Sequence, residues 1–599
     1  MSRPAALTQT VPEEQEPAVA PLEFRLIKRM WWWMRPYARK RNILLVLVVV
    51  RAVQLSMLAT VLGYVIEDVV SGGGPVRLAW GTVTYAVLAV FTMITMHYRI
   101  LFGMQIGELV VHDLRRDLFT RILSMPMGFY NRTKLGRFIS RMMSDAESVR
   151  AGVQEVLFVS IVNIVQMFTA ALVMAWIDWR LFLIVAAIAP IMWAINRIFH
   201  SRFSESFRRS QESMSRVTAT IAESVNGIRV TQGFSREEIN ADLFHEVVYK
   251  HGHYNVLNER LRGLFLPLLN LNNQLFLVAM LLVGGFLVLD ESMSIGDIVQ
   301  FFFLAGVFFQ PVRILGNLYA TAMTAMAGAE RVFRWIDMQP AWQDPDDATE
   351  LAEVRGEVIA RDLRFSYIPG EEVLRGIDFH AKPGDCIALV GHTGSGKSSL
   401  INLIAKFYLP DSGTLLIDGV DVRQISGPSL HRHLGIVLQS NFLFTGTVRD
   451  NIRYGRPSAS DADIDDILTR LDCRDLLEAL PDGLESSVGE GGTSLSLGQR
   501  QLVCFARAML ADPSILILDE ATSAVDTMTE ARIQKALETL LEGRTSFVVA
   551  HRLSTIRGAD QVLVLDHGEI IERGTHRELL KEGGHYADLY REFVKASDD

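Results

Sequence analysis

A glycine-rich loop ending in lysine is the part of this chain best suited to do chemistry. Residues 391–398 read Gly-His-Thr-Gly-Ser-Gly-Lys-Ser, which fits the phosphate-binding pattern G-x-x-x-x-G-K-[ST]. An apolar, strand-like run precedes the loop and a helix-like run follows it, as this motif requires. Backbone N–H groups of such a loop surround a triphosphate at the positive end of a helix. The residues expected at the phosphates are Gly391, Thr393, Gly394, Ser395, Gly396, Lys397, Ser398 and Ser399, with Ser398 also holding Mg²⁺.

Other side chains suited to the same reaction stand at the ends of apolar runs. Asp519 and Glu520 end one run, which provides one carboxylate for Mg²⁺ and one to polarise water. His551 ends another, within expected reach of a γ-phosphate, and Tyr367 follows a third, where its ring would stack on adenine. Taken alone, Asp519 and Glu520 would also suit exposed acids, His551 a capping histidine and Tyr367 a surface tyrosine. The phosphate loop is what favours the catalytic interpretation.

The first half of the chain is strongly apolar. A single apolar stretch would also suit a buried core helix, but six within 270 residues predict membrane spans of the usual ~20 residues. These stretches are Ile43–Ile66, Leu78–Met96, Val156–Ile177, Leu181–Ile198, Leu264–Leu289 and Ile298–Leu315.

The distribution of Lys and Arg predicts the orientation of these spans. The basic segment Arg25–Arg41 contains three consecutive tryptophans and suits an interfacial helix. The short connections 67–75, 178–180 and 290–293 are poor in Lys and Arg and are expected outside. The connections 99–155 and 199–263 are basic and are expected to form cytosolic helical legs of roughly 40 Å. Their turns, 125–133 and 223–230, suit either a docking surface or an ordinary helix turn.

Polar side chains within the spans are few, and each suits either a substrate contact or an interhelical hydrogen bond. They are Arg51, His97, Asn163, Gln166, Asn270, Asn272, Asn273, Gln274, Gln310 and Arg313. No acid interrupts the six apolar cores, which argues against proton antiport and metal transport. Arg51 and Arg313 would favour an anionic group on the substrate.

Composition excludes several other classes of protein. The formal net charge of −9 argues against a nucleic-acid partner, whose phosphates need a basic surface. The three cysteines fit neither a zinc pattern nor a disulfide framework and are expected to be free thiols. Residues 1–21 are polar and acidic, with several prolines, and are expected to be a disordered tail rather than a signal peptide.

The segment 495–501, Leu-Ser-Leu-Gly-Gln-Arg-Gln, completes a specific set of motifs. With the phosphate loop, Gln439, Asp519, Glu520, Asp526 and His551, the chain resembles an ATP-binding-cassette (ABC) exporter over about residues 22–595. The arrangement resembles a half-transporter, in which one transmembrane domain is fused to one nucleotide-binding domain. The segments 129–145 and 223–237 resemble the coupling helices of that family.

The resemblance implies a multidomain fold: an all-α six-helix transmembrane domain with long cytosolic extensions, followed by an α/β P-loop ATPase domain. The expected domains are 22–337 for the membrane part, 338–355 for a linker and 356–599 for the ATPase. A head-to-tail dimer would place the phosphate loop of one protomer opposite the other's signature segment. Its residues at ATP would be Ser496, Gly498 and Gln499, with Asp526 also at the nucleotide. Gln439 would sense Mg²⁺ and the γ-phosphate, Glu520 would activate water and His551 would stabilise the transferred phosphoryl group.

The implied ligands and partners are ATP, Mg²⁺, the lipid bilayer, a second half-transporter and a small hydrophobic or amphipathic substrate such as a drug or lipid. A homodimer is favoured, because neither Glu520 nor His551 is degenerate, and a heterodimer stays open. The expected location is the cytoplasmic membrane, with both termini and the ATPase domain in the cytosol.

Two positions depart from the family pattern. Leu497 stands where the family's signature usually has glycine, and Gly491 stands where arginine is common in the preceding loop. Ser496 and Gly498 remain, so we expect ATP turnover at an altered rate.

Three other functions compete with export. An ATP-gated regulatory or channel-like module is the main alternative, although such proteins often lack the carboxylate that Glu520 supplies. A soluble cassette ATPase acting on nucleic acid conflicts with the six spans. An importer conflicts with the fusion of the two domains in this order.

Overall fold

The computed structural model describes residues 23–519, 527–549 and 553–598, apart from some side chains within the long membrane helices, at 527–528 and 553–554, and in the last helix. The chain forms two compact units. The helical unit comprises the chain up to Leu123 together with Leu135–Met338. The α/β unit comprises Ser124–Lys134 and the chain from Gln339 onward, so it includes a short insertion from the helical half.

The helical unit is built on helices of 20 residues or more, six of them within the described chain. They are α2 (Ala38–Val70), α3 (Pro75–Leu123), α7 (Phe158–Ile177), α8 (Trp179–Asn226), α10 (Glu237–Leu289) and α11 (Ile295–Asp337). The predicted apolar stretches lie within these helices, apart from two residues just before α7. Polar caps fix some of their starts: Asp178 accepts hydrogen bonds at the start of α8, and Ser294 and Asp297 form a capping box on α11.

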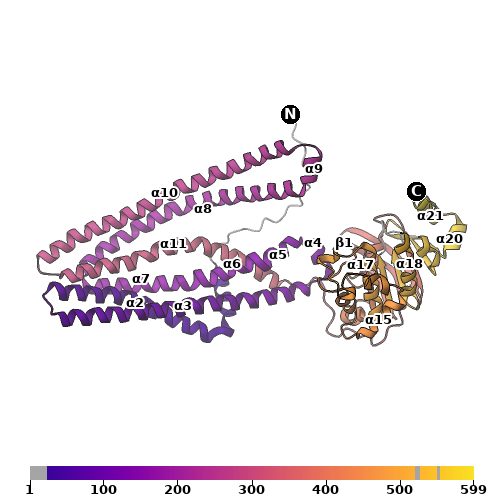
Figure 1. The fold of residues 1–599 in the computed structure, drawn as a ribbon, viewed down its shortest axis with the longest axis horizontal. Coiled ribbons are helices and arrows are strands. Elements are labelled where there is room, and N and C mark those ends of the chain that lie inside the picture. The colour runs from indigo at the N-terminus through magenta and orange to yellow at the C-terminus, as the bar shows by residue number, and fades with distance from the viewer. Residues whose placement is uncertain (1–22, 520–526, 550–552, 599) are drawn as a thin grey trace. The chain divides into compact units, whose positions relative to one another are not determined.

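Shorter helices connect the long ones. They are α1 (Phe24–Trp33), η1 (Arg35–Tyr37), α5 (Leu135–Ser140), η2 (Arg141–Asp145), α6 (Ala146–Ala151), η3 (Gly152–Leu157) and α9 (Ile228–Gly233). Two of them, η2 and η3, are π-helical. The sequence predicted a regular helical leg here, and the extra residue per turn of a π segment leaves no mark in the apolar pattern. Helices α8 and α10 pack along each other, with α9 at the tip of their hairpin (Figure 1).

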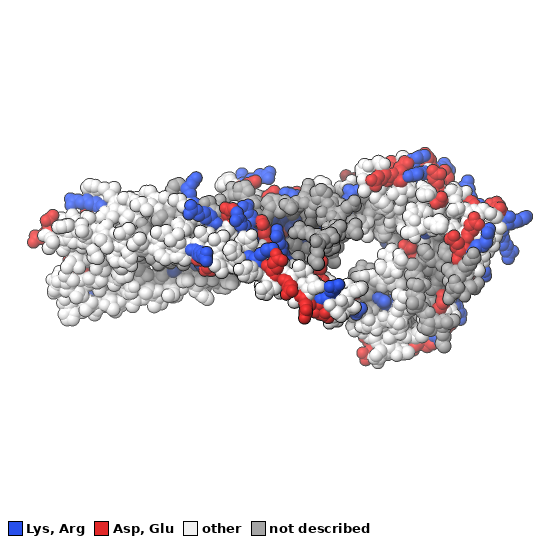
Figure 2. Space-filling view, turned by 90° about the horizontal axis from the view of Figure 1, so that it is seen from above, with Lys and Arg blue, Asp and Glu red and all other residues white. Residues whose placement is uncertain are grey.

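The surface of the helical unit suits lipid contact. Figure 2 shows long stretches of it without charged residues. Three helical stretches of the described chain are long and apolar enough to cross a membrane: Arg35–Val70, Pro75–Leu123 and Leu135–Ile177. The described apolar parts of α8, α10 and α11 are shorter, at Trp179–Ile188, Gln274–Leu289 and Ile295–Pro311.

Ion pairs are among the polar contacts that tie α11 to earlier parts of the helical unit. Asp145, whose side chain is 4% exposed, accepts hydrogen bonds from Arg141 at 2.5 Å and from Arg331 of α11. Arg29 of α1 donates from Nη1 and Nη2 to the two oxygens of Asp337, at 2.5 and 2.7 Å. The Arg29 guanidinium also lies 4.0 Å from the centre of the Phe333 ring. The first helix is therefore clamped to the last turns of α11.

The α/β unit contains two sheets. Antiparallel strands form the first, in the order β2-β1-β4-β5, from β1 (Val358–Ile368), β2 (Glu371–Ala381), β4 (Ser412–Ile417) and β5 (Val420–Asp421). The second has the order β10-β9-β3-β8-β7-β6, from β3 (Cys386–Val390), β6 (Leu434–Val437), β7 (Ile515–Asp519), β8 (Thr545–Val549), β9 (Gln561–Asp566) and β10 (Glu569–Gly574). All neighbouring pairs in it are parallel except β9–β10.

Helices surround the second sheet. They are α12 (Lys397–Ile404), α13 (Gly427–Arg432), α14 (Val448–Arg453), α15 (Asp461–Arg470), α16 (Arg474–Glu478), α17 (Leu497–Leu510), α18 (Thr527–Leu541), α19 (Leu553–Gly558), α20 (His576–Glu582) and α21 (His585–Asp598). The short 3₁₀ turns η4 (Gly483–Glu485) and η5 (Glu490–Gly492) precede α17. The inserted α4 (Met127–Arg132) belongs to this unit. The core between the two sheets includes Leu363, Phe379, Leu400, Leu415 and Phe547, all buried.

Candidate nucleotide-binding site

The predicted site residues follow the carboxyl ends of neighbouring parallel strands. Strands β3, β8, β7 and β6 are adjacent in that order. The glycine-rich loop follows β3, Asp519 is the last residue of β7, and Gln439 stands two residues after β6. Because the carboxyl ends of parallel strands meet at one edge of a sheet, these groups share that edge, where open α/β sheets bind ligands. Strand β8 ends two residues before His551, which lies outside the described residues together with Glu520 and Asp526.

The loop after β3 has a backbone that only glycine adopts readily. Gly391, Gly394 and Gly396 have φ values of +152°, +87° and +108°. A Cβ at Gly391 would lie 2.2 Å from the Leu565 carbonyl oxygen, and one at Gly396 would lie 2.7 Å from the side chain of Leu374. The loop is therefore tightly built, and its glycines are required by space as well as by conformation.

Lys397 opens α12 and turns back over the loop. Its Nζ donates to the carbonyl oxygens of Gly391 and His392, at 2.7 and 2.9 Å. Burial lowers the pKa of Lys397 below its ordinary value, and the Asp519 carboxylate opposes that change. This electrostatic interaction links the end of β7 to the loop, as a phosphate and metal site would require.

The three predicted Mg²⁺ residues lie at this edge and offer oxygen atoms, the donors that Mg²⁺ prefers. Ser398 and Gln439 are exposed, and Asp519 is half-buried. Within the described residues, no group of three or more His, Cys, Asp or Glu side chains forms a metal cluster. Such a cluster is not what this site needs, because Mg²⁺ usually keeps waters and binds substrate phosphates with one or two carboxylates.

Tyr367 lies beside the glycine-rich loop rather than free on the surface. Its hydroxyl is 3.1 Å from the Ser399 Oγ, and its ring packs edge-on against Phe365 and Tyr408, with centroids 4.8 and 5.1 Å away. Adenine stacking by this ring stays a prediction.

The signature segment forms the start of α17. Ser496 is the N-cap: its Oγ accepts from the Gln499 backbone N–H, and the Gln499 side chain accepts from the Ser496 N–H at 2.9 Å. This capping box holds Ser496 on the surface and leaves Gly498 buried in the first turn. Leu497 occupies the first helical position and is compatible with both hydrogen bonds of the cap.

Gly491, the second departure, has a φ of +63°. Gly489 and Gly492, on either side, also have positive φ values, of +70° and +83°. An arginine at position 491 would be strained in this backbone, so the loop geometry accounts for the glycine.

Helix α4, at the first predicted docking turn, contacts the rest of the α/β unit. The Asn131 side-chain amide donates to the Tyr408 hydroxyl at 2.7 Å, and Arg132 donates to the Tyr367 carbonyl oxygen at 2.6 Å. Tyr367 in turn contacts Ser399, two residues after Lys397. A short chain of contacts thus runs from α4 to the phosphate loop. The sequence did not identify Tyr408, because nothing in its local pattern marks it.

Three of the predicted intramembrane polar residues, Arg51, Asn163 and Gln166, donate to backbone carbonyl oxygens of the helices. Gln166 donates to the Val307 carbonyl oxygen of α11 at 2.9 Å, and Asn163 donates to Val159 of its own helix. Gln166 therefore fits the interhelical alternative. The side chains of Asn270, Asn272, Asn273 and Arg313 lie outside the description, and His97, Gln274 and Gln310 are exposed.

Comparison with known proteins assigns both units. Residues 42–312 match the family model of the ABC transporter transmembrane region, and residues 374–523 match the family model described as ABC transporter. An uncharacterized ABC transporter ATP-binding protein of Bacillus subtilis, YknV, is 35% identical over 95% of this chain and 95% of its own length. This chain belongs to the ABC transporter family.

Other similar proteins have more specific names. The ATP-dependent lipid A-core flippase of Syntrophus aciditrophicus is 32% identical, over 94% of both chains. A probable multidrug resistance ABC transporter of B. subtilis, YheH, is 36% identical over 84% of this chain and 75% of its own length. The structure of a bacterial Atm1-family ABC exporter with ATP bound superimposes with a TM-score of 0.78 at 26% identity, covering 93% of this chain and 98% of the other.

The predicted family and fold class are thereby confirmed. The chain is a membrane protein with a helical transmembrane region followed by an α/β nucleotide-binding domain. It binds ATP and is an ATPase coupled to transport, of the exporter type.

Proposed function

We propose that two copies of this chain form an exporter that moves a hydrophobic or amphipathic molecule, such as a lipid or drug, across the cytoplasmic membrane. One observation carries the proposal: α4, which lies between membrane helices α3 and α7 in the chain, is bonded to Tyr408 and Tyr367 beside the phosphate loop. A movement at the nucleotide site would therefore be transmitted through α4 to the membrane helices. The flippase and multidrug names of its relatives favour a lipid or drug-like substrate.

ATP would bind between the protomers. Lys397 and the N–H groups of the loop would bind the β- and γ-phosphates, and the exposed Ser496 of the partner would contact the same nucleotide. Glu520 would orient or deprotonate the attacking water, and His551 would stabilise charge on the transferred group. Hydrolysis by such a site is mostly positioning and charge stabilisation, and ATP changes the conformation only by binding the closed dimer more tightly.

Ser398, Asp519 and Gln439 would hold Mg²⁺. The ion would neutralise negative charge on the phosphates. Gln439 would also sense the presence of the ion and of the γ-phosphate.

Helix α9 supplies a second docking surface. Ile228, Val230 and Phe234 are exposed apolar residues of this turn, at 46%, 64% and 74%. An isolated chain would leave these side chains in water, whereas an ATPase domain in a dimer would cover them. With the basic connections on the cytosolic side, both termini would also lie in the cytosol.

Turnover by the purified chain in lipid nanodiscs tests the proposal. We expect ATP hydrolysis that Glu520→Gln abolishes and that Lys397→Ala loses through weaker ATP binding. Proteoliposomes should accumulate a fluorescent lipid or dye only with ATP, and not with Glu520→Gln. Transport unchanged by Glu520→Gln would refute active export. An ATP-gated ion current without uphill transport would instead establish the channel-like alternative. Absence of turnover in folded wild-type protein would contradict the homodimer.

A further inference from the structure

Arg51 of α2 and Arg99 of α3 lie where these two helices pack, and no acid among the described residues neutralises them. Arg51 stands eight residues after Ile43, roughly 12 Å along the predicted span at 1.5 Å per residue. The positive charges of Arg51 and Arg99 repel each other. Within the described part of the chain, neither guanidinium has a carboxylate partner. The Nε of Arg99 is buried without a hydrogen-bond partner. The sequence pattern missed Arg99, because it falls just beyond the apolar stretch that ends at Met96.

Gln54 adds a third donor to this interface. Its Oε1 lies 2.7 Å from the Thr95 Oγ1, while its side-chain nitrogen is buried without a hydrogen-bond partner. Arg51 donates from Nη1 to the Thr92 carbonyl oxygen at 3.2 Å, and the Thr95 hydroxyl lies 3.0 Å from that same oxygen. Arg99 follows Thr95 by four residues, on the same face of α3. Three donor side chains therefore gather at two turns of α3, where acceptors are few.

The Arg51 side chain does not extend toward the nearest membrane surface. Long basic side chains near a helix end normally extend to the closest interface. In the predicted orientation, the cytosolic interface is reached through residues of α3 beyond Arg99. Arg51 instead bonds to Thr92, inside the predicted span Leu78–Met96. Unneutralised charges inside a membrane are costly and mark functional positions. An anion with several oxygen atoms would satisfy all three donors, because guanidinium groups bind such anions through paired hydrogen bonds.

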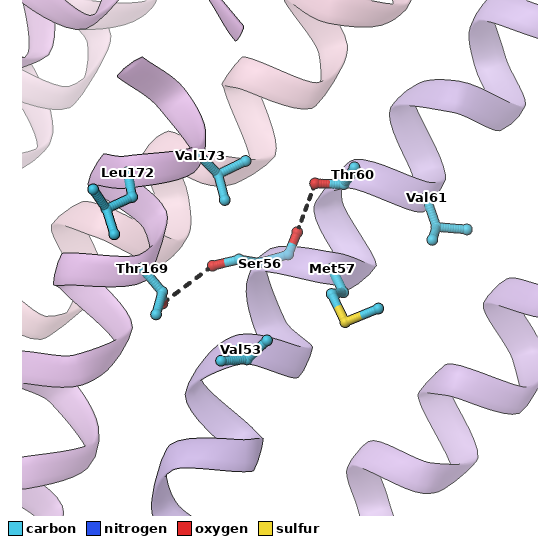
Figure 3. Close-up of a pocket in the computed structure, with 8 residues that line it drawn as sticks. All are labelled: Val53, Ser56, Met57, Thr60, Val61, Thr169, Leu172 and Val173. Atoms are coloured by element: carbon cyan, nitrogen blue, oxygen red, sulfur yellow. Dashed lines mark hydrogen bonds between the residues drawn. The ribbon is translucent and has the colours of Figure 1, made fainter. Parts of the chain in front are cut away.

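An apolar cavity adjoins this donor cluster. Its volume is about 260 Å³, and α2 and α7 line it through Val53, Ser56, Met57, Thr60, Val61, Thr169, Leu172 and Val173 (Figure 3). The Ser56 hydroxyl lies 3.4 Å from that of Thr169, and Thr60 donates to the Ser56 carbonyl, so the polar groups of the wall are paired. Val53 precedes Gln54, and Met57 follows it by three residues, so the cavity and the two donors of α2 lie on adjoining faces of that helix. The volume is below the ~300–1,000 Å³ of sites for whole drug-sized ligands, and it suits part of an apolar chain.

We propose that Arg51, Gln54 and Arg99 bind the anionic headgroup of an amphiphile whose apolar chain enters the cavity between α2 and α7. This inference rests on the proposed function, because it names the transported substrate as an anionic amphiphile. Phosphate, sulfate and carboxylate headgroups share the required chemistry.

Binding in the absence of ATP tests the headgroup site. The protein in phosphatidylcholine nanodiscs is titrated with fluorescent phosphatidylglycerol and with fluorescent phosphatidylcholine carrying the same chains. We expect tighter binding of phosphatidylglycerol, weakened about tenfold by Arg51→Gln or by Arg99→Gln, with phosphatidylcholine binding unchanged. The Arg51→Lys variant keeps the positive charge but not the planar guanidinium group. It should therefore lose less affinity for phosphatidylglycerol than Arg51→Gln. Arg180→Gln removes an exposed arginine at the far end of the membrane helices and should leave the affinity for both lipids unchanged.

A second arm distinguishes a transported substrate from a resident lipid. ATP-dependent movement of phosphatidylglycerol in proteoliposomes should fall in the same variants in proportion to binding. Equal affinity for the two lipids, or phosphatidylglycerol affinity insensitive to both glutamine variants, overturns the site. Charge-selective binding without transport overturns the substrate assignment and identifies a resident lipid. Because binding is read without ATP, a wild-type protein without turnover would count against the proposed exporter and not against this site. Unchanged thermal unfolding of Arg51→Lys verifies folding.

Discussion

Removing the contacts of α4 should uncouple transport from ATP hydrolysis. Asn131→Ala removes the hydrogen bond to the Tyr408 hydroxyl, and Arg132→Ala removes the one to the Tyr367 carbonyl. Both contacts are exposed, so each contributes about 1 kcal/mol rather than the larger value of a buried charged pair. Together they stabilise docking by about 2 kcal/mol, which corresponds to about a thirtyfold change in the docking equilibrium.

The assay is the number of fluorescent lipid molecules moved per ATP hydrolysed in proteoliposomes. We expect this ratio to fall at least severalfold in the Asn131→Ala/Arg132→Ala double variant, while basal hydrolysis persists, because the phosphate loop is untouched. Tyr408→Phe is the matched control: it keeps the ring contacts with Phe365 and Tyr367 and removes only the hydroxyl. It should therefore reproduce Asn131→Ala, and combining the two should add nothing further. An unchanged ratio in the double variant would refute the coupling role of α4.

Four further outcomes are expected. Gly391→Ala should weaken ATP binding and lower the stability of the ATPase domain by about 1–3 kcal/mol, because its Cβ would meet the Leu565 carbonyl; thermal unfolding with and without ATP measures both effects. Ser496→Ala should cost about 1 kcal/mol through the lost cap, whereas Ser496→Asn should keep stability, so a turnover defect shared by both variants would reflect lost ATP contact. Asp145→Asn should destabilise the helical unit by about 3–5 kcal/mol, because Arg141 and Arg331 lose a buried charge partner, and unchanged thermal unfolding would contradict that estimate. Burial raises the pKa of Cys386 and of Cys473 to about 12. Both thiols should therefore stay protonated and unreactive toward maleimide from pH 7 to 9 until the protein unfolds. Labelling of Cys386 or Cys473 in the folded protein that rises over this pH range would contradict the raised pKa values.

The sequence predicted the parts of this protein that local patterns encode. The apolar run before the glycine-rich loop is strand β3, and the helix-like run after it lies in α12. What the sequence could not predict depends on residues distant along the chain. The contact of Asn131 with Tyr408 spans 277 residues. Arg51 and Arg99 come close to each other only when helices α2 and α3 pack. The π-helical segments also escaped prediction, because one extra residue in a turn barely changes an apolar pattern.

The clamp between Arg29 and Asp337 has a consequence for the order of synthesis. The two residues are separated by 308 positions. At ~5–20 residues per second, a ribosome needs roughly 15–60 s to make the second after the first. Throughout that interval α1 has neither Asp337 nor Phe333 to hold it, and its exposed tryptophan and basic side chains can rest on the membrane surface. Only after that interval can α1 pack against the last turns of α11. The amphipathic character of this helix thus serves the nascent chain before it serves the finished transporter, and closure of the clamp reports that the membrane half has been completed.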